Sequence, residues 1–139
     1  MKFEGHVWKR GRFWLAEIPA LEYVTQGYTR EEAYEMAVDI VETGVDQKGF
    51  KATLERGSDG RFWISANQKT PLLALFIRRQ RQRHGLSVRQ AAERFSSSSP
   101  NSLGAYEQGK RIPSVLKLDE LVRTLSPQAD LIIGVKYTK

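Results

Sequence analysis

The first 27 residues carry a pattern of hydrophobic positions that predicts three short strands. Residues 3–9 and 12–18 are rich in aromatic and β-branched side chains, and they flank Arg10 and Gly11, which is typical of a tight β-hairpin. A further strand-like run over residues 23–26 ends at Gly27. We therefore expect three successive strands at the start of the chain.

The pattern then changes to one helix followed by two strands. Thr29 and Glu32 have the spacing of a capping box, which marks the start of a helix that ends near Gly44. Residues 50–55 and 61–66 are strand-like again and flank a Gly-Ser-Asp-Gly turn. The predicted order is β-β-β-α-β-β, a small sheet with one helix on one face. The apolar stripe expected to be buried on this helix contains Ala33, Met36, Ala37, Ile40 and Val41.

The second half of the chain has helical periodicity almost throughout. We place an α+β domain at residues 1–66, a polar linker at 67–71 and a second, all-α domain at 72–139. A short apolar run near the end, residues 130–135, predicts a final strand. The helices are expected from Leu72 to Gly85, over residues 87–95, over residues 99–108, and from Ser114 to Leu125.

The positive charge of the chain is concentrated in its second half. Residues 70–139 hold 12 Lys and Arg against 5 Asp and Glu, whereas residues 1–69 hold 10 against 11. A small domain with such an excess favours a polyanionic partner, because its cations displace the counterions condensed on phosphates. The chain has no cysteine, no signal-like start and no long apolar run, so we expect a cytoplasmic protein without a thiolate metal site.

The second and third predicted helices of the second half have side chains suited to a DNA groove. If Leu103 and Tyr106 anchor the helix over residues 99–108 in the core, its outward face offers amide and methyl groups that match adenine and thymine edges. Two cations follow the helix, where phosphates would run, and serines precede two helices. The expected DNA-contacting residues are Ser87, Arg89, Ser98, Ser99, Asn101, Ser102, Gly104, Ala105, Gln108, Lys110 and Arg111.

Residues 86–114 resemble the Cro/repressor-type helix-turn-helix family. The most specific part is Tyr-Glu-Gln-Gly-Lys-Arg-Ile-Pro-Ser at 106–114. The resemblance implies that residues 99–108 are the recognition helix and that Glu107 forms a buried ion pair with Arg81. It also implies binding to paired half-sites as a dimer or a higher even oligomer. The chain departs from the family pattern in a turn one residue longer, at 96–99, and in Val88, which replaces a common glutamine.

Residues 1–66 resemble the HicB antitoxin domain. The segment over residues 11–33 carries the resemblance, above all Thr25-Gln26-Gly27 leading into Thr29 and Glu32-Ala33. The resemblance implies a partial ribonuclease H-like fold, a HicA-like ribonuclease toxin as partner, and a DNA-binding module behind this domain. The leading hypothesis is therefore an antitoxin that neutralises such a toxin and represses its own operon; the toxin-contacting residues are unknown.

Two other functions stay open at this point. One is a stand-alone transcriptional regulator with a sensing or dimerising N-terminal domain, which a large apolar pocket there would favour. The other is a nuclease, which three clustered carboxylates would favour. Glu4 and Glu17 lie on neighbouring predicted strands without an aspartate, and His6 and His84 are isolated. We therefore expect no catalytic residue, no metal and no cofactor.

The predicted final strand suggests how the protein assembles. It follows the last helix of the domain core, so its backbone has little left to pair with in its own subunit. We expect it to pair with its mate across a two-fold axis. The alternative is that it folds back onto its own N-terminal sheet. The expected dimerisation residues are Leu131, Ile132, Ile133 and Val135.

Overall fold

The computed structural model describes residues 1–95 and 100–137. Their first half has the predicted order β-β-β-α-β-β, with a short 3₁₀ turn added after the second strand, and the α+β class is confirmed. The elements are β1 (Phe3–Arg10), β2 (Phe13–Ile18), η1 (Pro19–Leu21), β3 (Tyr23–Gly27), α1 (Arg30–Val45), β4 (Ala52–Arg56) and β5 (Arg61–Ala66). The helices that follow are α2 (Lys69–Arg83), α3 (Val88–Glu93), α4 (Pro100–Glu107) and α5 (Val115–Leu125).

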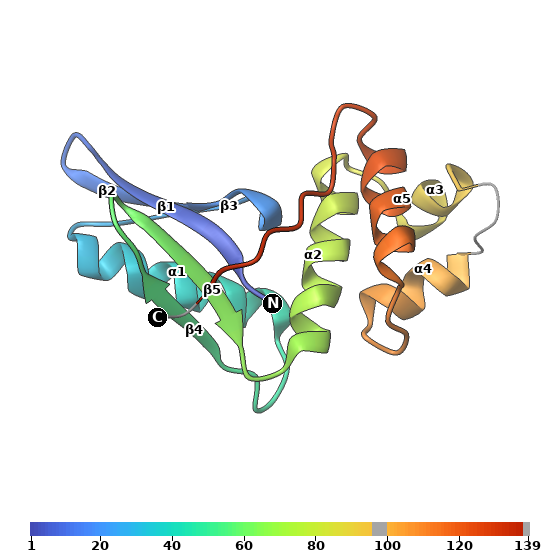
Figure 1. The fold of residues 1–139 in the computed structure, drawn as a ribbon, viewed down its shortest axis with the longest axis horizontal. Coiled ribbons are helices and arrows are strands. Elements are labelled where there is room, and N and C mark those ends of the chain that lie inside the picture. Colours follow the sequence, from blue (N-terminus) through green and yellow to red (C-terminus); the bar gives the residue numbers. More distant parts are fainter. Residues whose placement is uncertain (96–99, 138–139) are drawn as a thin grey trace.

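The five strands form one sheet in the order β3-β2-β1-β5-β4, with antiparallel neighbours throughout. Helix α1 lies against one face of this sheet (Figure 1), where Tyr34 meets Phe62 edge to face at 5.9 Å. The Thr29 hydroxyl caps the helix by accepting from the Glu32 amide at 3.0 Å. The Glu32 carboxylate accepts from the Tyr28 amide instead of the Thr29 amide, so the predicted capping box is only half formed.

The buried side of α1 matches the predicted stripe at Ala33, Ala37 and Val41, which are buried, and at Ile40, which is half-buried, but it departs from the stripe at Met36. Met36 was expected in the stripe but is exposed, whereas Tyr34 is buried together with Ala37 and Val41. Tyr34, Ala37 and Val41 follow the i, i+3, i+7 spacing of one helix face, and Met36 lies two residues beyond the first of them. The long tyrosine ring can reach Phe62 from this position, and this contact orients the helix on the sheet.

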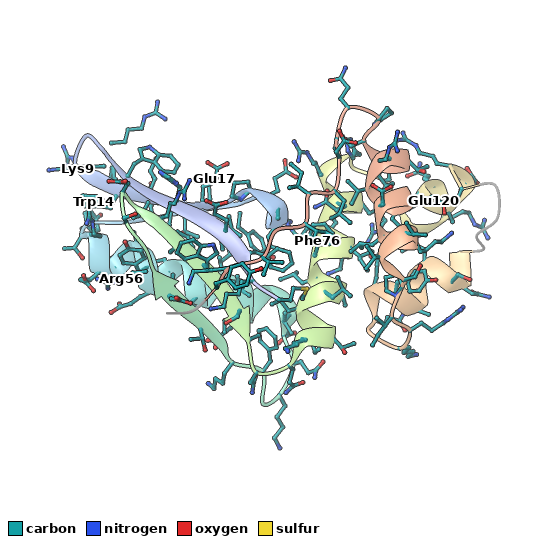
Figure 2. All side chains as sticks on the ribbon, in the orientation of Figure 1. Lys9, Trp14, Glu17, Arg56, Phe76 and Glu120 are labelled. Atoms are coloured by element: carbon teal, nitrogen blue, oxygen red, sulfur yellow. The ribbon has the colours of Figure 1, made fainter. Side chains whose placement is uncertain are left out.

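Helix α2 lies between the sheet and the other three helices of the second half (Figure 1). It begins at Lys69, three residues before the predicted start, so that Pro71 lies in its first turn. Phe76 of α2, which is labelled in Figure 2, stacks on Phe3 of β1 with ring centroids 5.5 Å apart. Buried side chains of both halves join in one hydrophobic cluster, and α2 contributes the central part of it.

The strand predicted over residues 130–135 is wrong. The chain is irregular after α5, and no backbone hydrogen bond joins residues 130–137 to the rest of the described chain. We call residues 129–137 the C-terminal tail; it runs from α5 back across the N-terminal sheet (Figure 1). Because it crosses a face of the sheet and does not follow an edge strand, no strand is beside it to pair with its backbone.

Replacing Gly5 by alanine is expected to lower the free energy of unfolding by about 1–3 kcal/mol, because overpacking a filled core forces its neighbours to move. A methyl group on Gly5 would stand 2.1 Å from the ring of Phe62, which is completely buried. Urea unfolding measures the effect. Gly134→Ala is the control, since nothing lies within 4 Å of its added carbon. Equal stability of the two variants would contradict this packing of β1 on β5.

Candidate nucleic-acid interface

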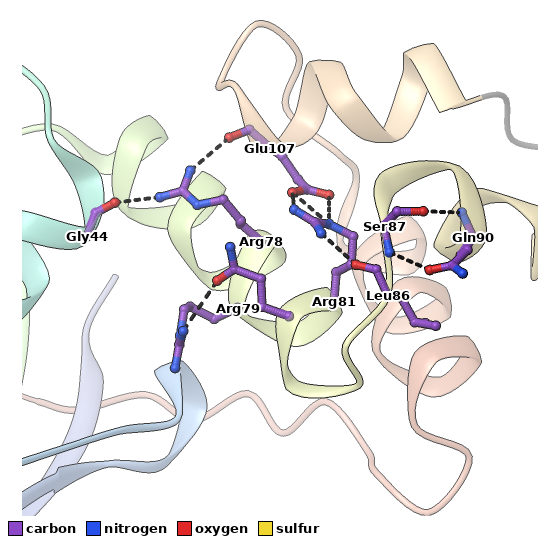
Figure 3. A network of polar contacts seen from close by, with 9 residues as sticks. Gly44, Arg78, Arg79, Arg81, Leu86, Ser87, Gln90 and Glu107 are labelled. Carbon is purple, nitrogen blue, oxygen red and sulfur yellow. Dashed lines mark hydrogen bonds and ion pairs between the residues drawn. The ribbon is translucent and has the colours of Figure 1, made fainter.

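Helix α3 begins with the capping box that the sequence predicted. The Ser87 amide donates to the Gln90 side chain at 2.8 Å, and the Gln90 amide donates to the Ser87 hydroxyl at 3.1 Å (Figure 3). Two backbone amides that would otherwise lack a partner are thereby satisfied. The small, buried side chains of Ala91 and Ala92 let α3 pack closely against α4.

Helix α4 is anchored by one side and offers the other to solvent. Leu103 and Glu107 are buried and Tyr106 is half-buried. Gly109 then ends the helix with a φ of +72°, a conformation that glycine adopts without steric cost. The outward side chains are those predicted: Asn101 and Gln108 are exposed, and Ser102, Gly104 and Ala105 are half-buried.

Arg81 of α2 holds the end of α4 through Glu107. The Arg81 Nε lies 2.8 and 3.0 Å from the two carboxylate oxygens, and its Nη2 lies 2.7 Å from Oε1 (Figure 3). The remaining arm of the guanidinium donates to the Leu86 carbonyl at 2.7 Å. Glu107 is the one fully buried charged residue in the described part of the chain. This pair fixes α4 and the start of the α3 segment to α2 together.

The neighbouring arginines of α2 attach the helix-turn-helix region to the N-terminal half. Arg78 Nη2 donates to the Gly44 carbonyl of α1 at 2.6 Å, and its Nη1 lies 3.4 Å from the Glu107 carbonyl (Figure 3). Arg79 donates to the Leu21 and Glu22 carbonyls at 2.8 and 2.9 Å. The sequence analysis did not single out either arginine, because nothing local shows that a helix cation will meet a carbonyl over 30 residues away.

These contacts reduce the number of cations that remain for phosphates. Arg78, Arg79 and Arg81 bind groups of the chain itself, although they belong to the basic half. By contrast, no group in residues 1–95 and 100–137 accepts a hydrogen bond from the side chain of Arg89 or Lys110. Both are exposed, as is Arg111, whose guanidinium lies 5.7 Å from the Tyr106 ring.

The remaining predicted contact residues are distributed around α4. Ser87 and Arg89 belong to the start of α3, which packs against α4, and Lys110 and Arg111 follow α4 directly. Ser98 and Ser99 lie outside the described residues. The region therefore presents amide, small and cationic groups on and beside a helix that its buried side holds in place, which is the arrangement needed to read a groove.

The described residues give little support for a metal site or a membrane-spanning helix. Glu4 is paired with Arg61 at 3.4 Å, and within the described ranges no three His, Asp or Glu side chains gather in a way that suits a metal ion. None of the helices in these ranges has the length and apolar content needed to cross a membrane.

Comparison with known proteins agrees with this geometry. Residues 72–131 match the family model described as a helix-turn-helix domain. No curated protein and no solved structure matches the chain. The matched segment begins in α2 and extends past α5 into the tail, and it supports a DNA-binding transcriptional regulator.

Proposed function

We propose that this protein is a HicB-type antitoxin that represses its own operon. In this proposal α4 reads operator DNA, two copies bind paired half-sites, and the N-terminal half binds a HicA-like ribonuclease toxin in the cytoplasm. The observation that carries the DNA-binding part is the anchored recognition helix, with Glu107 buried against Arg81 and Asn101 and Gln108 facing outward. The toxin partner and a ribonuclease H-like relationship rest on the resemblance of residues 1–66.

The protein acts in this proposal by binding and not by catalysis. Assembly would use the tail, where Ile132, Ile133 and Val135 are exposed while Leu131 is half-buried against the core. Co-expression with the product of the adjacent open reading frame, followed by affinity capture, tests the toxin partner. Capture of a ribonuclease whose activity falls in the complex supports the antitoxin. A chain that binds operator DNA but captures no such protein is a stand-alone regulator.

Gly104→Ala separates DNA contact from folding. A methyl group on Gly104 would meet nothing within 4 Å, and alanine favours a helix over glycine by about 0.5–1 kcal/mol, so the variant should be slightly more stable. If the backbone of Gly104 approaches the bases closely, the added carbon should nevertheless weaken operator binding by about tenfold or more. Thermal melting and fluorescence anisotropy give the two readouts. Unchanged affinity would show that α4 does not enter the groove by this face.

A further inference from the structure

The face of the sheet opposite α1 carries a row of side chains that the proposed DNA-binding function does not use. Phe62 points to α1, so its neighbour Trp63 points to the other face, because side chains alternate along a strand. Glu4 lies directly opposite Trp63 in the β1–β5 pair, and Glu55 lies opposite it in the β4–β5 pair. Two carboxylates and an indole ring therefore lie side by side on this face.

The tail inserts a lysine among these groups. The Lys136 Nζ donates to Glu55 Oε1 at 2.9 Å and lies 4.9 Å from the Trp63 ring. A carboxylate together with an aromatic face is a favourable environment for an ammonium group. The other oxygen of Glu55 accepts from Lys2, and the hydrogen bonds from Lys2 and Lys136 lower the pKa of the Glu55 carboxyl to about 2. The carboxylate is therefore charged at neutral pH.

The tail is only loosely attached to this face. Beneath it lies an open groove of about 950 Å³ between the tail, the start of β1 and η1. Ile132 and Val135 border the groove but remain 87% and 74% exposed, and no backbone hydrogen bond joins residues 130–137 to the rest of the described chain. Apart from Ala129 and Leu131, which pack against the core, Lys136 makes the contacts that hold the tail on the sheet.

We propose that the sheet face beneath the tail, around Glu55 and Trp63, is the docking site for an extended, lysine-bearing segment of a protein partner, and that the tail covers this face in the absence of that partner. The inference rests on the proposed function insofar as the partner is the toxin. The occupant is identified by the lysine of the chain itself, which lies between the Glu55 carboxylate and the Trp63 ring; Glu4, opposite Trp63, is already paired with Arg61. A docked partner displaces the tail, whose exposed side chains Ile132, Ile133 and Val135 are the proposed assembly residues, so partner binding and assembly act on the same segment.

A labelled synthetic peptide with the sequence of residues 129–139 serves as the probe for this site. It is titrated against the full wild-type chain, the Lys136→Glu variant and the Lys51→Glu variant, in which another exposed lysine, just before β4, is changed as the control. The tail competes at a millimolar effective concentration in the wild type and in the control. Lys136→Glu replaces this contact by repulsion from Glu55, so it should bind the peptide at least tenfold more tightly.

A second change in the Lys136→Glu chain tests the lysine position. Adding Glu55→Gln, or replacing the peptide lysine that corresponds to Lys136 by glutamine, should weaken peptide binding about fivefold. Equal affinities across wild type, Lys136→Glu and Lys51→Glu would overturn the proposal, and so would peptide binding that is insensitive to both glutamine changes. Matching melting temperatures exclude unfolding as the cause. Operator binding is measured in parallel and tests only the proposed DNA-binding function. Failure of the docking site can therefore be distinguished from failure of the proposed function.

Discussion

Replacing Glu107 by alanine is expected to destabilise the protein by about 3–5 kcal/mol, because removing one partner of a buried ion pair leaves the other charge without compensation. Glu107 is 5% exposed and accepts three hydrogen bonds from Arg81, whose side chain is 14% exposed. After the substitution, the Leu86 carbonyl is the one partner that the Arg81 guanidinium keeps among the described residues. Because this pair joins α2 to the end of α4, the loss should also weaken DNA binding through the disturbed helix.

Urea unfolding at neutral pH measures this effect, and two further variants make it specific. Glu120→Ala is the control, because the Glu120–Lys117 pair is 3.4 Å long with Glu120 exposed, and such pairs contribute about 0–1 kcal/mol. The double variant Arg81→Met with Glu107→Leu should recover much of the lost stability, because apolar groups of similar size replace both charges. If the free energy of unfolding of Glu107→Ala lies within about 0.5 kcal/mol of the wild-type value, the pair does not hold α4 in place.

Local sequence signals predicted most of the elements, because the interactions that they report are themselves local. The Ser87–Gln90 capping box joins residues three positions apart and forms both of its hydrogen bonds. Gly109 follows α4 as expected, and strand β5 has the predicted bounds. Arg81 and Glu107, by contrast, are 26 residues apart, and only the resemblance to a known family connected them before the structure brought their side chains together.

Long-range packing accounts for what the sequence did not predict. The apolar residues 130–135 have the composition of a strand, but a strand also needs a neighbouring backbone, and the tail crosses a sheet face. The basic charge of the second half indicated phosphate contacts, yet Arg78 and Arg79 bind carbonyls of α1, η1 and the residue after η1. The amino-acid composition does not distinguish these arginines from Arg89 and Lys110. Only the tertiary structure shows which cations bind groups of the chain itself and which are exposed.

This separation gives an expected salt dependence for DNA binding. Arg89, Lys110 and Arg111 are the exposed cations on and beside the α3–α4 region whose side chains neither pair with a carboxylate nor donate to a carbonyl of the described chain; Arg94, also exposed, donates to the Leu125 carbonyl. If each neutralises one phosphate, a dimer neutralises about six, and log K should fall with log salt at a slope near −5 because each contact releases condensed counterions. Between 50 and 200 mM salt the affinity for operator DNA should then fall by about a thousandfold.

Single variants of these cations show whether they are the ones that meet the phosphates. Lys110→Gln and Arg111→Gln should each weaken binding to all sequences alike and reduce the magnitude of the slope by about 1–2, since each change removes one contact per copy. Lys51→Gln removes an exposed lysine of the N-terminal half, so it should leave the slope unchanged. A full-length protein whose slope is the same in all three variants would contradict the interface, because its DNA contacts would then lie away from α4. A slope that changes only for Lys51→Gln would move the DNA-binding surface to the N-terminal half.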